Sequence, residues 1–192
     1  MFFRASANPT LRPPARGGFW RAGLRLHRNE NGATTVEFAL IALPFFALLF
    51  AILETGMAFF AANVLETAVT NSARLIRTGQ AQTQGITAQT FKDSICSQLV
   101  YMFNCSSGLY VDVETFASFA AITLTPPLDQ NGNLKQNGYV YQAGHGGDIV
   151  VVRAYYEWPT FVTQLGNNLA DMPDGSHLLV ATAAFRNEPF PW

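Results

Sequence analysis

An apolar stretch without a charged residue runs from Phe38 to Leu53 and continues beyond Glu54 into further apolar sequence. On an α-helix, which rises about 1.5 Å per residue, Glu37 and Glu54 stand about 25 Å apart. This distance is close to the roughly 30 Å of a bilayer's hydrocarbon core, so both carboxylates can reach the interfaces. The stretch therefore predicts one transmembrane helix, with a spanning part over about residues 36–60.

Past the membrane, the same helix is predicted to become amphipathic and to dock on a soluble domain. Its apolar residues recur at helical spacing, at Met57, Phe60, Val64, Ala68 and Leu75. Arg74 and Arg77 favour the negative end of a helix dipole, and Gly79 can adopt the left-handed cap. We expect the helix to end near Thr78, within a helical segment over residues 33–79.

The segment before Gly32 is rich in arginine. Six arginines stand there against the single acid Glu30, whereas the rest of the chain has six basic and twelve acidic residues. Positive charge beside the first apolar segment holds that end in the cytoplasm, so the topology is N-in, C-out. A basic arm can also bind nucleic acid, but the apolar run directly behind it favours membrane topology. We assign no nucleic-acid partner and interpret residues 1–32 as a disordered, removable cytoplasmic leader.

Cys96 and Cys105 are the only cysteines of the 192 residues, and this topology places both outside the cytoplasm. Disulfides persist there, so a bridge between them is expected. Closing so short a loop stabilises a fold by roughly 2 to 3 kcal/mol in the chain-entropy model. The alternative is one buried and one exposed thiol.

Residues 86–192 are predicted to form one periplasmic α+β domain. Thr87 is a plausible N-cap for a short helix whose apolar face holds Phe91, Ile95, Leu99 and Met102. Four strands are expected, at Leu109 to Thr115, Ala121 to Thr125, Ile149 to Trp158 and Leu178 to Phe185. The predicted fold is a small antiparallel sheet with the long helix packed across one face.

Three other segments were considered as catalytic or metal sites and rejected. His145 lies among glycines that indicate a turn before a strand. The loop beginning at Asp129 starts like a calcium loop, but Leu134 and Val140 replace the glycine and glutamate that such a loop needs. His177 has no nucleophile motif beside it. We therefore predict no catalytic residue, metal, cofactor or small-molecule substrate, and hence no enzyme.

The run Gly32-Ala-Thr-Thr-Val-Glu37-Phe38 resembles the type III signal of type IV pilins. In that family a prepilin peptidase cuts after the glycine, and the fifth residue of the mature chain is a glutamate followed by Phe or Tyr. The resemblance implies processing between Gly32 and Ala33. It also implies that Glu37 and Phe38 act in assembly.

This run, together with Leu53-Glu54-Thr-Gly, Asn63-Val-Leu-Glu66 and Ser72-Ala-Arg74, resembles the TadE-like pilus-assembly family. The late segments around Arg153 and Arg186 look similar too. The resemblance implies a pilin-like fold and a pseudopilin or minor pilin of the tight-adherence (Tad, Flp, type IVc) secretion system.

Such a protein is a single-pass inner-membrane protein with a periplasmic C-terminal domain, and it resides in the membrane or in the pilus itself. The implied partners are the prepilin peptidase, other Tad pseudopilins, the Flp pilin and inner-membrane platform proteins. The alternative is a signal-anchored periplasmic binding module or enzyme whose N-terminal tether stays uncleaved.

Overall fold

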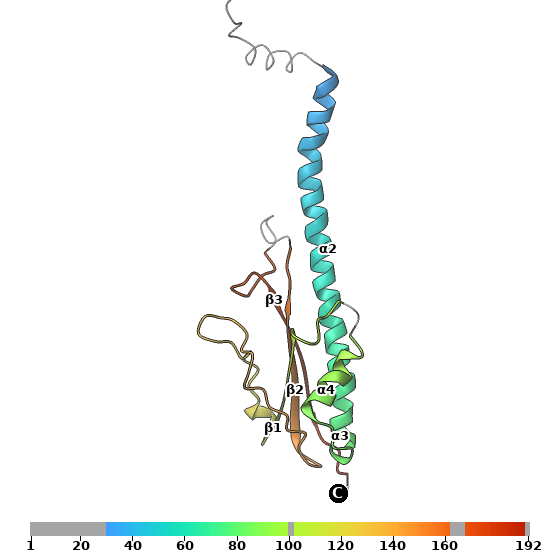
Figure 1. The fold of residues 1–192 in the computed structure, drawn as a ribbon, viewed down its shortest axis with the longest axis vertical. Coiled ribbons are helices and arrows are strands. Elements are labelled where there is room, and N and C mark those ends of the chain that lie inside the picture. The colour runs from blue at the N-terminus through green and yellow to red at the C-terminus, as the bar shows by residue number, and fades with distance from the viewer. Residues whose placement is uncertain (1–29, 100–101, 162–167, 191–192) are drawn as a thin grey trace, which may run out of the picture. The chain divides into compact units, whose positions relative to one another are not determined.

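The structure is a computed structural model that describes residues 30–99, 102–161 and 168–190 (Figure 1). Most of the leader expected to be disordered, residues 1–29, lies outside this part, whereas Glu30 and Asn31 are helical, which corrects the expectation for these two residues. The contacts divide the chain into two units, Met1–Phe46 and Ala47–Trp192. Helix α2 (Glu30–Arg77) begins in the first unit, continues through Pro44 and ends in the second.

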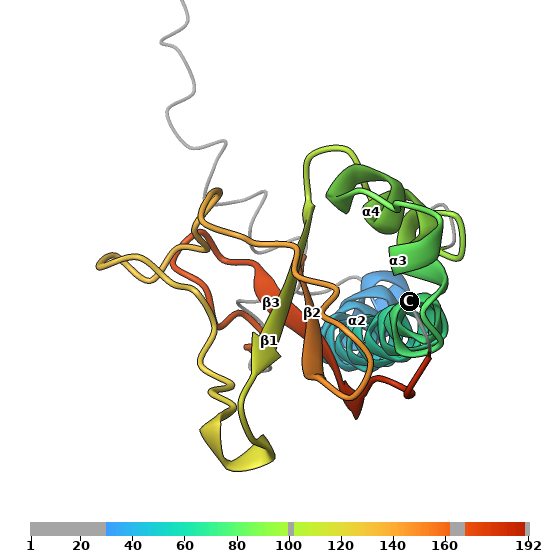
Figure 2. The same cartoon turned by 90° about the horizontal axis from the view of Figure 1, so that it is seen from below.

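The second unit has the expected α+β architecture, with a three-stranded antiparallel sheet. Its strands are β1 (Leu109–Phe116), β2 (Ile149–Trp158) and β3 (His177–Arg186), in the order β1-β2-β3. Alternating side chains of β2 point to the two faces of the sheet, as the period of a strand requires. Helices α2, α3 and α4 gather on one of these faces (Figure 2).

The part of α2 that packs on the sheet presents mainly small side chains. Its buried residues are Ala58, Ala61, Leu65, Ala68, Val69, Ser72, Ala73 and Ile76, at helical spacing. They pack against sheet residues such as Val152 and Ala154, which are fully buried. Small side chains let a helix axis approach a sheet closely and fill the space without voids.

The prediction of which α2 residues face the soluble domain is wrong in detail. Of its five residues only Ala68 is buried, Val64 and Leu75 are half-buried, and Met57 and Phe60 are 52% and 55% exposed. Large and small apolar residues follow the same helical period, and their hydrophobicity does not tell which stripe faces the sheet. The stripe that docks consists mainly of small residues together with Leu65, Val69 and Ile76, and it leaves Met57 and Phe60 facing outward.

Two short helices follow a sharp turn at Gly79, which has a φ of 76°. Helix α3 (Gln80–Thr83) was not expected, whereas α4 (Ala88–Cys96) begins where the sequence indicated. The Thr87 hydroxyl caps α4 by accepting a hydrogen bond from the Thr90 N–H at 3.3 Å. The side chain of Phe91, on this helix, is fully buried, as predicted.

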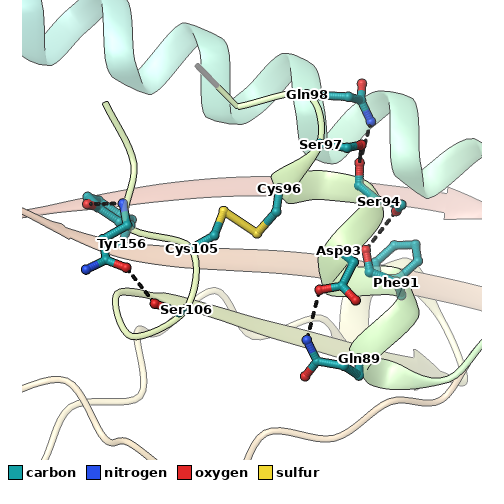
Figure 3. The surroundings of a disulfide bond; sticks show 11 residues. Gln89, Phe91, Asp93, Ser94, Cys96, Ser97, Gln98, Cys105, Ser106 and Tyr156 are labelled. Carbon is teal, nitrogen blue, oxygen red and sulfur yellow. Dashed lines mark hydrogen bonds between the residues drawn. A yellow bond between two sulfur atoms is a disulfide. The ribbon is translucent and has the colours of Figure 1, made fainter. Parts of the chain in front are cut away.

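A disulfide ties the end of α4 to the segment that leads into β1. Cys96 and Cys105 are bonded, with their Cα atoms 5.9 Å apart, so the expected bridge is present (Figure 3). Nearby, the Asn104 N–H donates to the hydroxyl of Tyr156 on β2, at 3.0 Å. The disulfide and this hydrogen bond hold the segment against the sheet.

The strand expected over residues 121–125 does not form. Its place holds the end of a short 3-10 helix, η1 (Phe119–Ala121), and then irregular chain with Leu124 exposed. The outer edge of β1 is occupied instead by residues 140–142: the Val113 N–H donates to the Val140 oxygen, and the Val113 oxygen accepts from the Gln142 N–H. Strand propensity depends on context, and at this edge residues 140–142 supply the pairing in place of residues 121–125.

Candidate functional site

The expected processing and assembly residues all lie in the first turns of α2. Gly32, Ala33, Glu37 and Phe38 are helical, and Gly32, Glu37 and Phe38 are exposed within the first unit. A Cβ atom added at Gly32 would meet nothing within 4 Å. The Gly32–Ala33 peptide bond thus lies in a helix with open space around the glycine.

Between Phe38 and Phe60, the exposed large side chains of α2 are apolar. Its exposed large side chains include Phe38, Leu40, Ile41, Leu43, Phe45, Phe46, Leu48, Phe50, Ile52, Leu53, Met57, Phe59 and Phe60. Contiguous apolar surface of this extent marks contact with a membrane or another protein. The helix from Thr34 to Arg77 is long and apolar enough to cross a bilayer. Apolar residues facing outward fit a lipid environment.

The two expected disulfide residues belong to the second unit and hold its fold. The structure brings Cys96 and Cys105 together with each other. Gly32, Ala33, Glu37 and Phe38 are brought together only as neighbours along one helix.

A buried charge cluster on the face of the sheet away from α2 was missed by the sequence analysis. The Arg153 guanidinium lies 2.8 Å from an oxygen of Asp112, contacts the Glu114 carboxylate and donates to the Thr123 carbonyl at 2.9 Å. A cavity of about 210 Å³ adjoins it, lined in part by Lys135. The feature of the sequence that could have revealed this cluster is a single arginine in the middle of the apolar strand β2. A buried charge needs partners, so this arginine implies acidic groups nearby.

Three tyrosines beside this cluster form a small second core. Tyr139 stacks on Tyr110 at 5.3 Å between ring centroids and lies 6.1 Å from Tyr155. Burial, more than the neighbouring groups, raises the pKa of the Tyr139 and Tyr155 hydroxyls. These rings pack on the sheet and stay protonated, and Leu134 and Met172 complete the core.

The segments rejected as metal or catalytic sites serve local structure. The carboxylate of Asp129 is used inside its own loop: its Oδ1 accepts the N–H groups of Asn131 and Asn133, each at 2.8 Å. The Asn133 N–H is the first cause that lowers the pKa of Asp129. His145 lies in a turn directly before β2, as predicted, and its carbonyl accepts the Asp148 N–H. Within the described ranges, no group of three His, Cys, Asp or Glu side chains is placed to hold a metal ion.

The structure combines one long apolar amino-terminal helix with a small antiparallel sheet, the α+β arrangement expected from the sequence. Residues 32–74 match the family model described as TadE-like protein, which confirms the resemblance for this segment. The chain therefore carries a TadE-like segment, which supports a general involvement in the Tad pilus system. The similar-looking segments after residue 149 lie outside the match. Searches of curated proteins and of solved structures found no match.

Proposed function

We propose that this protein is a pseudopilin or minor pilin of the Tad pilus, processed by prepilin peptidase between Gly32 and Ala33. The observation that carries the proposal is that the TadE-like segment begins at Gly32, with Glu37 exposed at the head of an apolar helix. In this account the helix crosses the inner membrane, and residues 86–192 form the periplasmic domain.

The position of the scissile bond supports processing. Peptidases bind substrates as extended chain, so the first turn of α2 must unwind before the Gly32–Ala33 bond is cut. That turn lies at the helix end, where fraying is common. Glycine also weakens a helix by about 1 kcal/mol relative to alanine. Local unwinding at Gly32 is therefore cheap, and the missing side chain leaves the bond accessible.

Cleavage creates the partner that Glu37 needs. Before the cut, Ala33 has an amide nitrogen; afterwards it carries an ammonium group at the start of the mature chain. Two unit charges about 4 Å apart attract by roughly 4 kcal/mol at an effective dielectric of 20, against about 1 kcal/mol in water. We propose that the Glu37 carboxylate pairs with the Ala33 ammonium of a neighbouring subunit inside the membrane. An unprocessed chain would leave a carboxylate in lipid without this partner.

The partners follow from the same proposal. They are the prepilin peptidase, other Tad pseudopilins, the Flp pilin and the inner-membrane platform. Phe38, exposed next to Glu37, would pack against the helix of the neighbouring subunit.

The substitution Glu37→Gln tests the proposal because it keeps the size of the side chain and removes the charge. We expect the variant to insert into the membrane and form the Cys96–Cys105 disulfide, but to be lost from pili and from complexes with other pilins. Glu66→Gln is the matched control, since Glu66 is exposed on the polar part of the same helix. Normal assembly of the Glu37→Gln protein would contradict the role of this carboxylate.

A further inference from the structure

The outward surface of α2 changes character abruptly within the second unit. Its exposed side chains are large and apolar up to Phe60. From Asn63 onward the exposed residues are polar or charged: Asn63, Glu66, Thr67, Thr70, Asn71, Arg74 and Arg77. A helix that leaves a bilayer shows this change at the edge of the hydrocarbon. The chemistry of the helix surface therefore places that edge between Phe60 and Asn63.

Glu54 lies on the membrane side of this edge. It is six residues before Phe60, or about 9 Å along a helix. A carboxylate at that depth is costly, and membrane proteins retain one where protein groups or water satisfy it. The sequence alone suggested that Glu54 could reach the interface; the structure supplies a protein donor for it.

The donor is the backbone of the loop that follows β2. The Phe161 N–H donates to Oε1 of Glu54, across 107 positions of sequence. Just before it, the Thr160 hydroxyl donates to the Gly175 carbonyl, which ties this segment to the chain that leads into β3. The end of β2 that carries this segment lies alongside α2 (Figure 1). The sheet therefore holds the Phe161 backbone at the depth of the Glu54 side chain.

The Phe161 side chain is 84% exposed. An aromatic ring this open to water is unfavourable unless a partner covers it, because burying a phenylalanine side chain is worth roughly 1.5 to 3 kcal/mol. Its backbone is fixed on Glu54, next to a helix surface formed by Leu53 and Met57, both exposed and apolar. The Phe161 side chain therefore lies in the same environment as that helix surface.

We infer that the segment Pro159 to Phe161 is a membrane-contact element whose Phe161 ring inserts into the outer leaflet of the bilayer. Its N–H meanwhile satisfies the Glu54 carboxylate. The bilayer is the occupant because the apolar helix surface at the same depth is the continuation of the membrane-spanning segment. This inference rests on the membrane-spanning part of the proposed function and is independent of processing at Gly32. The contact would seat this end of the sheet at the membrane surface.

The test places a photoreactive p-benzoylphenylalanine at position 161 of the full chain in native membranes and illuminates it. Matched variants carry the same residue at Leu53, on the apolar part of α2, and at Leu124, exposed on the irregular chain after η1. We expect the protein labelled at 161 and at 53 to gain the mass of a phospholipid, and the protein labelled at 124 to gain none.

The outcomes separate the two claims. Lipid adducts at 53 without lipid adducts at 161, or a crosslink from 161 to another protein subunit, would overturn the membrane contact while leaving the spanning helix intact. No lipid adduct at 53 would overturn the spanning segment on which both proposals rest. Adducts at 124 equal to those at 161 would overturn the claim that this segment is special.

A second experiment isolates the N–H of Phe161. Proline has no N–H, so Phe161→Pro should cause a loss of membrane-integrated protein that Phe161→Ala does not cause. Glu54→Gln should restore integration of the proline variant, because a neutral amide is cheaper to leave without a partner in the bilayer than a carboxylate. Failure of Glu54→Gln to restore it would contradict the pairing of these two groups.

Discussion

Arg153 and Asp112 lie directly opposite each other on β2 and β1, with Nη2 of the arginine 2.8 Å from Oδ2 of the aspartate. Their side chains are only 7% and 12% exposed. The other carboxylate oxygen of Asp112 accepts the Val140 N–H at 3.0 Å. This pair therefore fixes the register of two strands and also holds the segment that covers the outer edge of β1.

Removing one partner of this pair should be costly, since it leaves a buried charge alone. We expect Arg153→Met to lower the free energy of unfolding by about 3 to 5 kcal/mol. The comparison variant is Glu114→Gln, at the more exposed carboxylate that the same guanidinium contacts, with an expected cost below about 1 kcal/mol. Denaturant unfolding of the detergent-solubilised protein measures both. Equal losses for the two variants would show that burial of the pair is not what matters.

Gly79 joins α2 to α3 in a conformation that other residues rarely adopt, with a φ of 76°, and the ring of Phe190 lies where a Cβ would stand, at 2.7 Å. We expect Gly79→Ala to lower the free energy of unfolding by roughly 2 to 4 kcal/mol, from backbone strain and overlap together. Gly85 distinguishes the cost of backbone strain from the cost of steric overlap. It has a φ of 62° with open space around it, so Gly85→Ala should cost only about 1 to 2 kcal/mol. Thermal unfolding of both variants checks the difference, and a Gly79 variant no worse than the Gly85 variant would exclude the Phe190 contact as a cause.

Burial first, and the charge of Asp174 second, raise the pKa of Glu157 above 4.5. A carboxyl with a raised pKa binds its proton more tightly in the folded state, so its protonated form stabilises the fold at low pH. That contribution is lost as the pH rises through the folded pKa. Glu157→Gln should therefore raise Tm at neutral pH, and the gain should disappear below pH 4.5. A gain that persists unchanged in acid would assign the effect to something other than ionisation.

The sequence predicts well where one local rule decides the outcome. The strand over Ile149 to Trp158 has the predicted bounds, because its apolar and aromatic residues leave no competing structure. Thr87 caps α4 and Gly79 takes the left-handed turn for equally local reasons. The disulfide follows from there being two cysteines close in sequence on the same side of a membrane.

Features that depend on tertiary contacts were missed or predicted wrongly. The docking stripe of α2 was misassigned because apolar residues on different sides of the helix share one period, and only contact with the sheet selects the stripe that contains Ala61, Leu65 and Ala68. The strand predicted over residues 121–125 does not form, and residues 140–142 pair with the outer edge of β1 instead. The contact between Glu54 and Phe161 joins positions that no local pattern connects. At the candidate processing site, the sequence already supplied Gly32, Ala33, Glu37 and Phe38 through resemblance, and the structure adds their helical setting.

The central claim is that cleavage after Gly32 creates the ammonium group that Glu37 pairs with. The most direct measurement is intact-mass and N-terminal peptide mass spectrometry of the protein isolated from membranes of piliated cells. The account predicts a mature chain that begins at Ala33, with an N-methylated or free amine. A functional protein that still carries residues 1–32 would contradict it and favour an uncleaved anchor.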